Sequence, residues 1–213
     1  MDWAVIPPNI PYLLWGLWVS VKLATVTIAF SFPLGCLIAV GRLSRNRWIS
    51  GACATFVNVL RSNPLVLMLF WFYFLVPLLI GRPVGDLASA MIAFVIFFTA
   101  YFTEIVRSGI QSVGRNQIQA GLSTGLSYLQ SMRYIVLPQA IRAMLPALTT
   151  ECIIVFQGTT VAYVIGLNEL LHRTSLVAER TIRPAELYVF VAVVYLVICY
   201  SASLFARRLE KSR

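Results

Sequence analysis

Acidic residues, histidine and cysteine are all scarce in this 213-residue chain. Eight Asp and Glu stand against seventeen Lys and Arg, with one histidine and four cysteines, and charged residues make up only 12% of the chain. An average soluble domain carries about 25% charged residues, so this chain has too few to cover a soluble surface. The cysteines are widely spaced in or beside apolar runs. We therefore expect them to pack as small apolar side chains, and we expect no metal site.

The motifs of common catalytic and nucleotide-binding sites are absent as well. The chain has no GxxxxGK[ST] loop, so it cannot hydrolyse ATP by that route. It also lacks HExxH, GxSxG and paired carboxylates beside a base, which argues against an enzyme. Its basic residues cluster at the ends of apolar runs, not along a helix with interleaved aromatics. Nucleic-acid binding is therefore not expected.

Apolar residues fill the chain instead, at 59% of the sequence with a mean hydropathy of +0.82. This content excludes disorder. A bilayer core about 30 Å thick requires about 20 apolar residues per helix. We predict an all-α integral membrane protein, surrounded by lipid, that forms a single domain over residues 1–213. Its five transmembrane helices are expected at about residues 21–41, 65–80, 87–106, 144–167 and 187–206.

Prolines mark the expected boundaries near the N-terminus. Pro7, Pro8 and Pro11 are predicted to break the chain before the first span, and Pro33 to kink that span. The stretch 48–60 is expected to lie at the membrane interface, before the second span.

The distribution of Lys and Arg predicts the orientation of the five spans. Most of these residues fall on one side, which the positive-inside rule makes cytoplasmic. Arg61 is counted with this cytoplasmic set because it precedes the predicted second span. The N-terminus is therefore predicted to lie outside and the C-terminus in the cytoplasm.

The long predicted cytoplasmic connection runs from residue 108 to residue 142. Its apolar periodicity indicates two short helices, over 117–124 and 129–137. Gly125 separates them, and Pro138 is expected to end the second. Two helices at an angle across the membrane surface are one interpretation, and an amphipathic loop resting on lipid is the other.

Three groups of residues in this connection have a characteristic spacing. They are Gln119-Ala120-Gly121, Gly125 and Ile135-Val136-Leu137-Pro138. This spacing resembles the EAA loop of ABC importer permeases, whose pattern is EAA, three residues, Gly, nine residues and I-x-L-P. Gln stands here for the first Glu, and Gly for the second Ala.

The resemblance extends over nearly the whole chain. Residues 60–65 (LRSNPL) resemble the F-R-G-T-P-L of the polar amino-acid branch, and residues 100–107 (AYFTEIVR) its A-Y-x-x-E-I-x-R. Residues 157–160 (QGTT) fall where many members read K-D-T-S. The stretches 70–77 and 156–157 are most similar to glutamate/aspartate permeases.

The resemblance implies a multi-subunit importer in the bacterial inner membrane. In this family the EAA loop forms coupling helices that dock in a separate ATPase dimer, which binds ATP and Mg, so this chain itself needs no cofactor. An extracytoplasmic amino-acid-binding protein delivers the substrate. Five helices are too few to enclose an amino-acid pathway, so a second permease subunit is implied. We expect a heterodimer, because Gly158 replaces the K-D-T-S aspartate that a partner chain could provide.

The resemblance also assigns the ATPase contact to the matching residues of the loop. Ile135 and Leu137 are expected to anchor the second helix on the membrane domain, and Gly125 to form the bend. The expected coupling residues are Gln119, Ala120, Gly121, Gly125, Ile135, Leu137 and Pro138.

Two acidic residues lie at membrane depth, where ionisable side chains mark a functional site by default. Glu104 and Arg107 are three residues apart, so they can face each other on one helix as a structural ion pair. Glu151 is the only charged residue of the fourth span and can hold a substrate ammonium; pairing with Arg142 is the alternative. The predicted substrate pathway consists of Glu151, Gln157, Gly158, Thr159 and Thr160.

The expected substrate depends on two departures from the family pattern. Glu151 disfavours an acidic side chain in the site, whereas Gly158 removes a carboxylate and favours one. Glutamate or aspartate is the predicted substrate, with basic or neutral polar amino acids as the alternative. An ion-coupled secondary transporter is the alternative of a different class, but it would normally contain internal repeats, and the sequence has no convincing one.

Overall fold

The computed structural model describes residues 3–211, and every regular element in that range is helical. The prediction of an all-α membrane domain is confirmed. The long helices are α1 (Ile6–Arg42), α5 (Asp86–Ser112), α8 (Leu137–Gly158) and α10 (Pro184–Lys211). The short ones are α2 (Arg47–Arg61), α3 (Leu65–Phe70), α4 (Val76–Ile80), α6 (Arg115–Ser123), α7 (Tyr128–Ser131) and α9 (Leu170–Thr181).

Four helical stretches within residues 3–211 are long and apolar enough to cross a membrane. A fifth follows if α2 and the helical segment 65–80 are counted together as one bent span. The four straight candidates are Trp3–Arg42, Asp86–Ser112, Tyr128–Ile165 and Pro184–Arg208.

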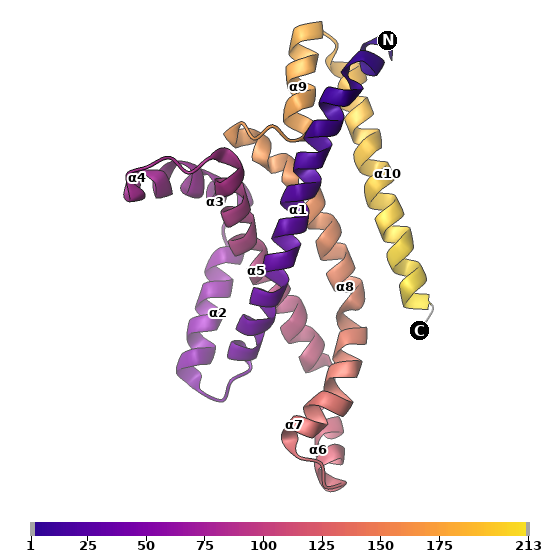
Figure 1. Cartoon of the computed structure of the whole chain (residues 1–213). Helices are drawn as coiled ribbons and strands as arrows, with labels where there is room; N and C mark the ends of the chain where they lie inside the picture. The colour runs from indigo at the N-terminus through magenta and orange to yellow at the C-terminus, as the bar shows by residue number, and fades with distance from the viewer. Residues whose placement is uncertain (1–2, 212–213) are drawn as a thin grey trace.

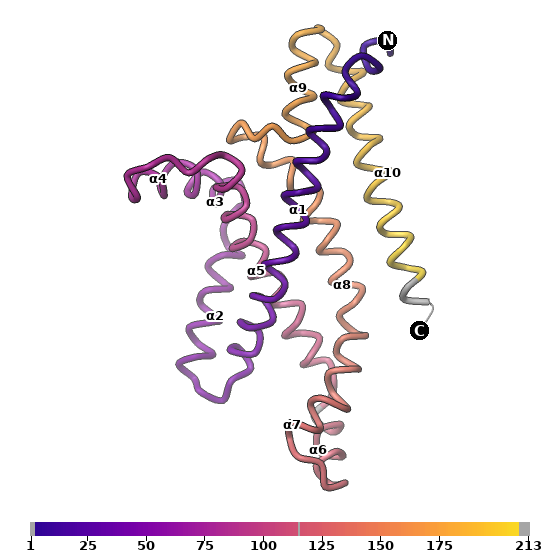
Figure 2. The backbone as a smooth tube through the Cα atoms, in the orientation of Figure 1, coloured from indigo at the N-terminus to yellow at the C-terminus, as the bar shows by residue number. Residues whose placement is uncertain are grey.

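Helix α5 lies at the centre of the bundle, between α1 and α8 (Figure 1). Of its most apolar stretch 61% is buried, against 11% for α10. The core around α5 contains the buried rings of Phe94, Phe98 and Phe102, with Leu23 of α1 and Val155 of α8. Helix α10 runs along one side, in contact with α8 and α9 (Figure 2). Its apolar outer face is therefore left for lipid or a partner chain.

The prolines near the N-terminus do not break the chain, contrary to the prediction. Helix α1 begins at Ile6 and continues through Pro7, Pro8, Pro11 and Pro33. Pro7 and Pro8 lie in the first turn, where backbone N–H groups have no partner within any helix. Pro11 and Pro33 lie in the interior and each remove one helical hydrogen bond without ending the helix.

The stretch 48–60, expected at the interface, belongs to a helix that packs inside the bundle. Helix α2 runs back alongside α1, and near its start the Ser50 hydroxyl donates to the Arg42 carbonyl at 2.8 Å. Val57 and Leu60 are buried in the core. The amphipathic pattern that indicated an interfacial position instead reflects one face against α1 and α5 and one uncovered face.

The chain bends by 99° between α2 and residues 65–80. The predicted second span is therefore not a straight crossing: α3 still packs on α5, and α4 extends to the side in Figure 1. Pro64 has no N–H and an extended ψ of 140°, so a helix cannot continue through it. The Ser62 hydroxyl donates to the Asn58 carbonyl at 2.8 Å, so one of the last carbonyl groups of α2 has a side-chain hydrogen bond.

A proline inside the third long helical stretch is accommodated by a π-helical turn, Met132–Val136. The Leu137 N–H donates to the Met132 carbonyl, five residues back, immediately before Pro138. The wider turn removes the clash between a proline ring and the carbonyl four residues earlier. Pro138 therefore does not end the second loop helix as predicted, and α7 continues into α8. The same arrangement precedes Pro77.

Two helical segments lie at opposite ends of the bundle (Figure 2). Helix α9 lies beside the N-terminal half of α1, and α6 with α7 forms the far end. The predicted outer connection 168–186 thus contains a helix of its own.

Candidate functional site

The connection between α5 and α8 turns sharply at the end of α6. Gly125 has a φ of +86°, and its N–H donates to the Leu122 carbonyl at 3.1 Å. The N–H of Leu126 donates to the Gly121 carbonyl at 3.1 Å. This pair of bonds forms a Schellman motif, which needs a left-handed residue after the helix. The bend lies at Gly125, where the sequence predicted it, because glycine adopts a positive φ without a steric penalty.

A second glycine, Gly121, allows α6 to approach the following helix. A Cβ atom here would lie 2.6 Å from Ser131 Oγ and 2.9 Å from Ile135 Cδ1. The alanine of the family pattern would not fit without movement, which explains the departure from EAA. Helix α7 begins with a capping box, in which Ser127 and Gln130 each accept the other's backbone N–H.

We call the connection between α5 and α8, residues 113–136, the coupling loop after the role predicted from the sequence, and most of the predicted coupling residues in and beside it are exposed. Exposed residues are Gln119, Ala120, Ser123, Gly125, Ser127, Leu137 and Pro138. Ile135 is half-buried, Leu137 is 37% exposed and Val136 is only 1% exposed. The anchor expected at Leu137 is therefore supplied by Val136, because the π-helical turn contains one extra residue and changes which side chain faces inward.

Glu104 lies at the centre of a charge cluster that joins three helices. Arg107 of α5 donates to Glu104 Oε2 from Nε at 3.1 Å and from Nη2 at 2.7 Å. Arg42 of α1 forms an ion pair with Glu104 Oε1, and Arg61 of α2 approaches Oε2 to 3.9 Å. The predicted pair with Arg107 is thus one of three arginine contacts. One carboxylate against three guanidinium groups leaves this region positively charged.

Arg61 is the last residue of α2, and its half-exposed side chain faces α5. It is fourteen residues from the start of α2, which at 1.5 Å per residue is about 21 Å from the loop that joins α1 to α2. Its guanidinium lies 5.4 Å from the centre of the Tyr101 ring, and its side chain is 43% exposed. Arg61 is therefore the least enclosed of the three arginines and the one most able to meet another group.

Glu151 lies close to this cluster. Helices α5 and α8 are antiparallel: Gly109 packs against Met144, and Phe98 packs against Gly158. Glu151 is halfway between these two contacts on α8, at the level of Thr103 and Glu104 on α5. It is 7% exposed, its Oε1 has no hydrogen-bond partner, and Arg61 exerts an electrostatic attraction on it.

The alternative pairing of Glu151 with Arg142 is not observed. No ion pair joins the two among the described residues, and nine residues of helix separate them by about 13 Å along the axis. Glu151 is thus a buried acid with one free oxygen, which requires a partner from outside this chain or a movement of Arg61.

The remaining predicted pathway residues divide between two faces of α8. Gly158 shares the Glu151 face and packs against Phe98, Leu65 and Phe94. Gln157 is exposed and lines a hollow of about 580 Å³ between α8 and α10. Beyond α8, Thr159 and Thr160 begin the 3-10 helix Thr159–Ile165, and their hydroxyls donate back to carbonyls one turn earlier. The structure thus groups Glu151 with Gly158 and separates both from Gln157.

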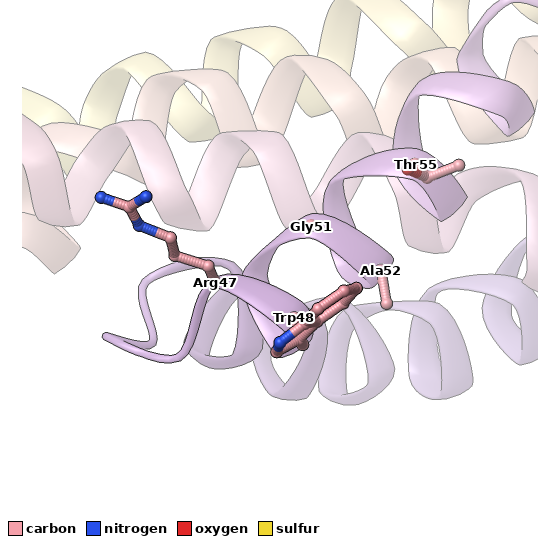
Figure 3. A pocket seen from close by; sticks show the side chains of 5 residues that line it. All are labelled: Arg47, Trp48, Gly51, Ala52 and Thr55. Atoms are coloured by element: carbon pink, nitrogen blue, oxygen red, sulfur yellow. The ribbon is translucent and has the colours of Figure 1, made fainter.

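The other large hollow, of about 630 Å³, lies along the first turns of α2 (Figure 3). Figure 3 shows its five lining residues, Arg47, Trp48, Gly51, Ala52 and Thr55, on this one helix. Trp48 is 88% exposed, and a Cβ at Gly51 would meet no atom within 4 Å. It is an uncovered helix face, far along α2 from Arg61, and does not belong to the charge cluster.

The sequence pattern does not reveal the surroundings of two residues of interest. Arg61 precedes the predicted second span, and its contacts with Glu104 and Tyr101 are visible only in the structure. Glu169 was not singled out, although it directly precedes α9 and is fully buried. Within residues 3–211 no group of three or more His, Cys, Asp or Glu could hold a metal ion.

A kinked helical bundle with a charge cluster between three of its helices and a two-helix loop at one end is typical of a membrane transport subunit. The family model of the binding-protein-dependent transport system inner membrane component matches residues 31–213. The chain belongs to this family of ABC importer permeases. Its members are membrane permease subunits without catalytic activity, and the ATPase is a separate subunit. An ion-coupled secondary transporter is not favoured.

Individual relatives cover almost the whole chain. The glutamate/aspartate import permease protein GltK of Escherichia coli O6:H1 is 41% identical over 217 residues, covering 99% of this chain and 97% of its own length. The probable glutamine ABC transporter permease protein GlnP of Bacillus subtilis is 35% identical, over 92% of both chains. A crystal structure of an amino acid ABC transporter with histidines superposes with a TM-score of 0.94, at 28% identity, over 100% of this chain and 99% of that one.

Proposed function

We propose that this chain is a permease subunit of an importer for glutamate or aspartate. The similarity to GltK supports this substrate class. The structural observation that carries the proposal is the excess of arginine in the charge cluster between α1, α2 and α5, where Arg42, Arg61 and Arg107 surround Glu104. An acidic amino acid has two carboxylates and one ammonium, so it requires more cationic than anionic partners.

Glu151 supplies the partner for the substrate ammonium in this proposal. It is buried and has one oxygen without a hydrogen-bond donor. Arg61, at the same level, is available for a substrate carboxylate because it is held loosely by Glu104 at 3.9 Å. Gly158 leaves no second carboxylate on this face of α8, which suits an acidic side chain.

Uptake by the reconstituted importer tests the substrate and the role of Glu151. The importer, with its sister permease, ATPase and binding protein, is assayed with labelled Glu, Asp, Gln, Arg and His. Glu and Asp are expected to be transported, and Glu151→Gln to lower the apparent affinity about 10–100-fold, because a hydrogen bond to a charged group contributes about 1.5–3 kcal/mol. Thr150→Ala is the control, since its exposed hydroxyl donates only to the Pro146 carbonyl.

The outcomes separate the two parts of the proposal. Uptake of Arg or Gln but not of Glu overturns the substrate class. Unchanged uptake and selectivity in Glu151→Gln remove Glu151 from the pathway while leaving the substrate class intact.

The coupling loop is proposed to contact an ATPase dimer, which binds ATP and Mg. Its exposed residues Gln119, Ala120, Ser123 and Ser127 lie at the far end of the bundle from α9. A cysteine at Gln119 is expected to form a crosslink to the ATPase, whereas a cysteine at Ile182, which is 85% exposed near α9, is not. The reverse result contradicts this arrangement.

The remaining partners and the orientation are proposed on the family pattern. A second, different permease chain completes the pathway, because it would cover the apolar outer face of α10 and the exposed apolar residues Leu78, Leu79 and Ile80 of α4. A binding protein delivers substrate at the α9 end, which is proposed to be outside together with the N-terminus. We expect a thiol reagent to label Ile182→Cys from outside the cell and Ser127→Cys only from the cytoplasmic side. The opposite labelling pattern would reverse the proposed orientation.

A further inference from the structure

The first turn of α9 is capped by a carboxyl group that has no exposed surface. Glu169 is 0% exposed and directly precedes the helix. Its Oε2 accepts the Leu171 N–H at 2.8 Å, and its Oε1 accepts the His172 N–H at 2.7 Å. Two of the N–H groups that every helix leaves unpaired at its start are therefore satisfied by this one side chain.

The same carboxylate connects α9 to α1. Ser20 of α1 donates to Glu169 Oε2 at 3.4 Å, and the Ser20 oxygen accepts the Leu170 N–H at 3.3 Å. One turn away, a Cβ on Gly16 would lie 3.0 Å from the Glu169 carbonyl oxygen and from Leu170 Cα. The backbones of α1 and α9 are thus in direct contact, and a bulkier residue at Gly16 would separate them.

Two exposed contacts continue this interface along α9. Arg173 donates to the Tyr12 carbonyl at 3.2 Å, and its guanidinium lies 4.4 Å from the centre of the Tyr12 ring. Arg180 donates to Asn9 Oδ1 at 3.0 Å. Glu169 differs from Arg173 and Arg180, because among the described contacts of this interface it is the acidic side chain and it is fully buried.

Polar and ionisable groups lie on every element packed around Glu169, but none forms an ion pair with it within residues 3–211. Helix α10 contributes the Tyr195 hydroxyl, the 3-10 helix contributes Tyr163 beside His172, and α9 contributes His172 and Arg173. Helix α1 contributes Ser20 and, beyond Arg173, Tyr12. Arg173 donates from Nε to the Asn168 carbonyl at 3.2 Å and from Nη1 to Tyr12.

We propose that Glu169 is a positioning residue that holds α9 on α1 while its carboxyl group is neutral and loosens this contact when it ionises. A buried charge without a cation is costly, and opening the interface returns it to water. Burial raises the pKa of Glu169 from an ordinary 4.5 to about 7, although the N–H groups of Leu171 and His172 and the Ser20 hydroxyl oppose the rise.

The raised pKa fixes the direction of the pH effect. The closed interface binds a proton more tightly than the open one, so it is most favoured below pH 4.5 and loses that advantage as the pH rises to about 7. The ratio of open to closed interface is expected to rise up to about 300-fold over this interval, the factor that this pKa difference allows, and then to level off.

Hydrogen exchange of the intact importer in lipid nanodiscs tests the proposal. Peptides covering residues 166–176 report on the N–H groups of Leu171 and His172. After correction for the intrinsic pH dependence of exchange, opening is expected to increase between pH 5 and pH 7. Glu169→Gln is expected to abolish this dependence, and the exposed Glu179→Gln to retain it. A flat profile in the unmodified protein, or an unchanged profile in Glu169→Gln, overturns the proposal.

A second variant keeps the test decisive if Glu169→Gln fails to assemble. Ser20→Ala removes the hydrogen bond between α1 and Glu169 but leaves the helix cap. We therefore expect it to raise opening of the interface at every pH and to keep the pH dependence. Loss of the pH dependence in Ser20→Ala would contradict the role of Glu169. The exchange measurement does not depend on the transported substrate. A failure of the proposed glutamate or aspartate uptake therefore leaves this result interpretable.

Discussion

Arg107 donates two hydrogen bonds to a single oxygen of Glu104, at 3.1 and 2.7 Å, within one turn of α5. The other oxygen pairs with Arg42, so the carboxylate bridges α5 to α1. Arg61 extends the contact to α2 at 3.9 Å. Removal of this one carboxylate leaves three guanidinium groups facing one another.

Glu104→Gln is expected to lower assembly of the membrane domain more than it lowers substrate affinity. Loss of one partner of a buried ion pair costs about 3–5 kcal/mol, and the partial exposure of these side chains reduces that cost. Thermal unfolding and the yield of intact complex measure assembly, with the exposed Glu179→Gln as control. Normal assembly with altered selectivity would place Glu104 in the substrate site instead.

Gly125→Val is expected to uncouple ATP hydrolysis from transport while the protein still inserts in the membrane. A Cβ at this position meets no atom within 4 Å, so the effect comes from the backbone alone. A φ of +86° costs a β-branched residue about 1–2 kcal/mol. The ratio of ATP hydrolysed to substrate transported is the measurement. Gly114→Ala, at φ −55° in open space, is the matched control.

A substitution of Gly125 by asparagine separates the effect of backbone strain from the loss of a contact with the ATPase. Because Asn adopts the left-handed conformation more readily than Val, Gly125→Asn is expected to retain most of the coupling. Equal damage by Asn and Val argues that the ATPase contact, and not the turn, requires glycine.

Gly121→Ala restores the family alanine but is expected to destabilise the coupling loop. Its Cβ would lie 2.6 Å from Ser131 Oγ, and such overpacking costs about 1–3 kcal/mol. Ser131 Oγ is buried without a hydrogen-bond partner, so Ser131→Ala alone is expected to be neutral. The double variant should recover part of the loss in protease resistance of the loop. A fully stable Gly121→Ala would show that the loop adjusts freely.

Local patterns predicted the helical content, the Gly125 bend and the i,i+3 geometry of Glu104 and Arg107, because each depends on neighbouring residues. The prediction that Pro138 ends the second loop helix was wrong, because the outcome there depends on packing as well as on neighbouring residues. Proline disfavours a continuing α-helix, but a single π-helical turn removes the clash, and packing of Val136 inside the domain stabilises that turn. Sequence periodicity does not contain this tertiary contribution.

The positions of Arg61 and Glu169 depend still more on contacts between distant segments. Arg61 contacts Glu104 and Tyr101, which lie about forty residues later in the chain. Glu169 is fixed by Ser20, 149 residues away. A span assignment from hydropathy does not reveal such contacts, because they join segments that are far apart in the sequence.

Arg61→Gln is expected to lower uptake of acidic amino acids more than uptake of any neutral amino acid that the importer accepts. Arg61 is the arginine whose guanidinium is partly free, at 3.9 Å from Glu104 and 43% exposed. Loss of a charged hydrogen bond to a substrate carboxylate corresponds to about 10–100-fold in KM. Arg61→Lys keeps the charge but loses the planar stacking on Tyr101, so an intermediate effect is expected. The exposed Arg82→Gln is the control. An equal loss for all substrates, together with reduced thermal stability, would assign Arg61 to structural support of Glu104 alone.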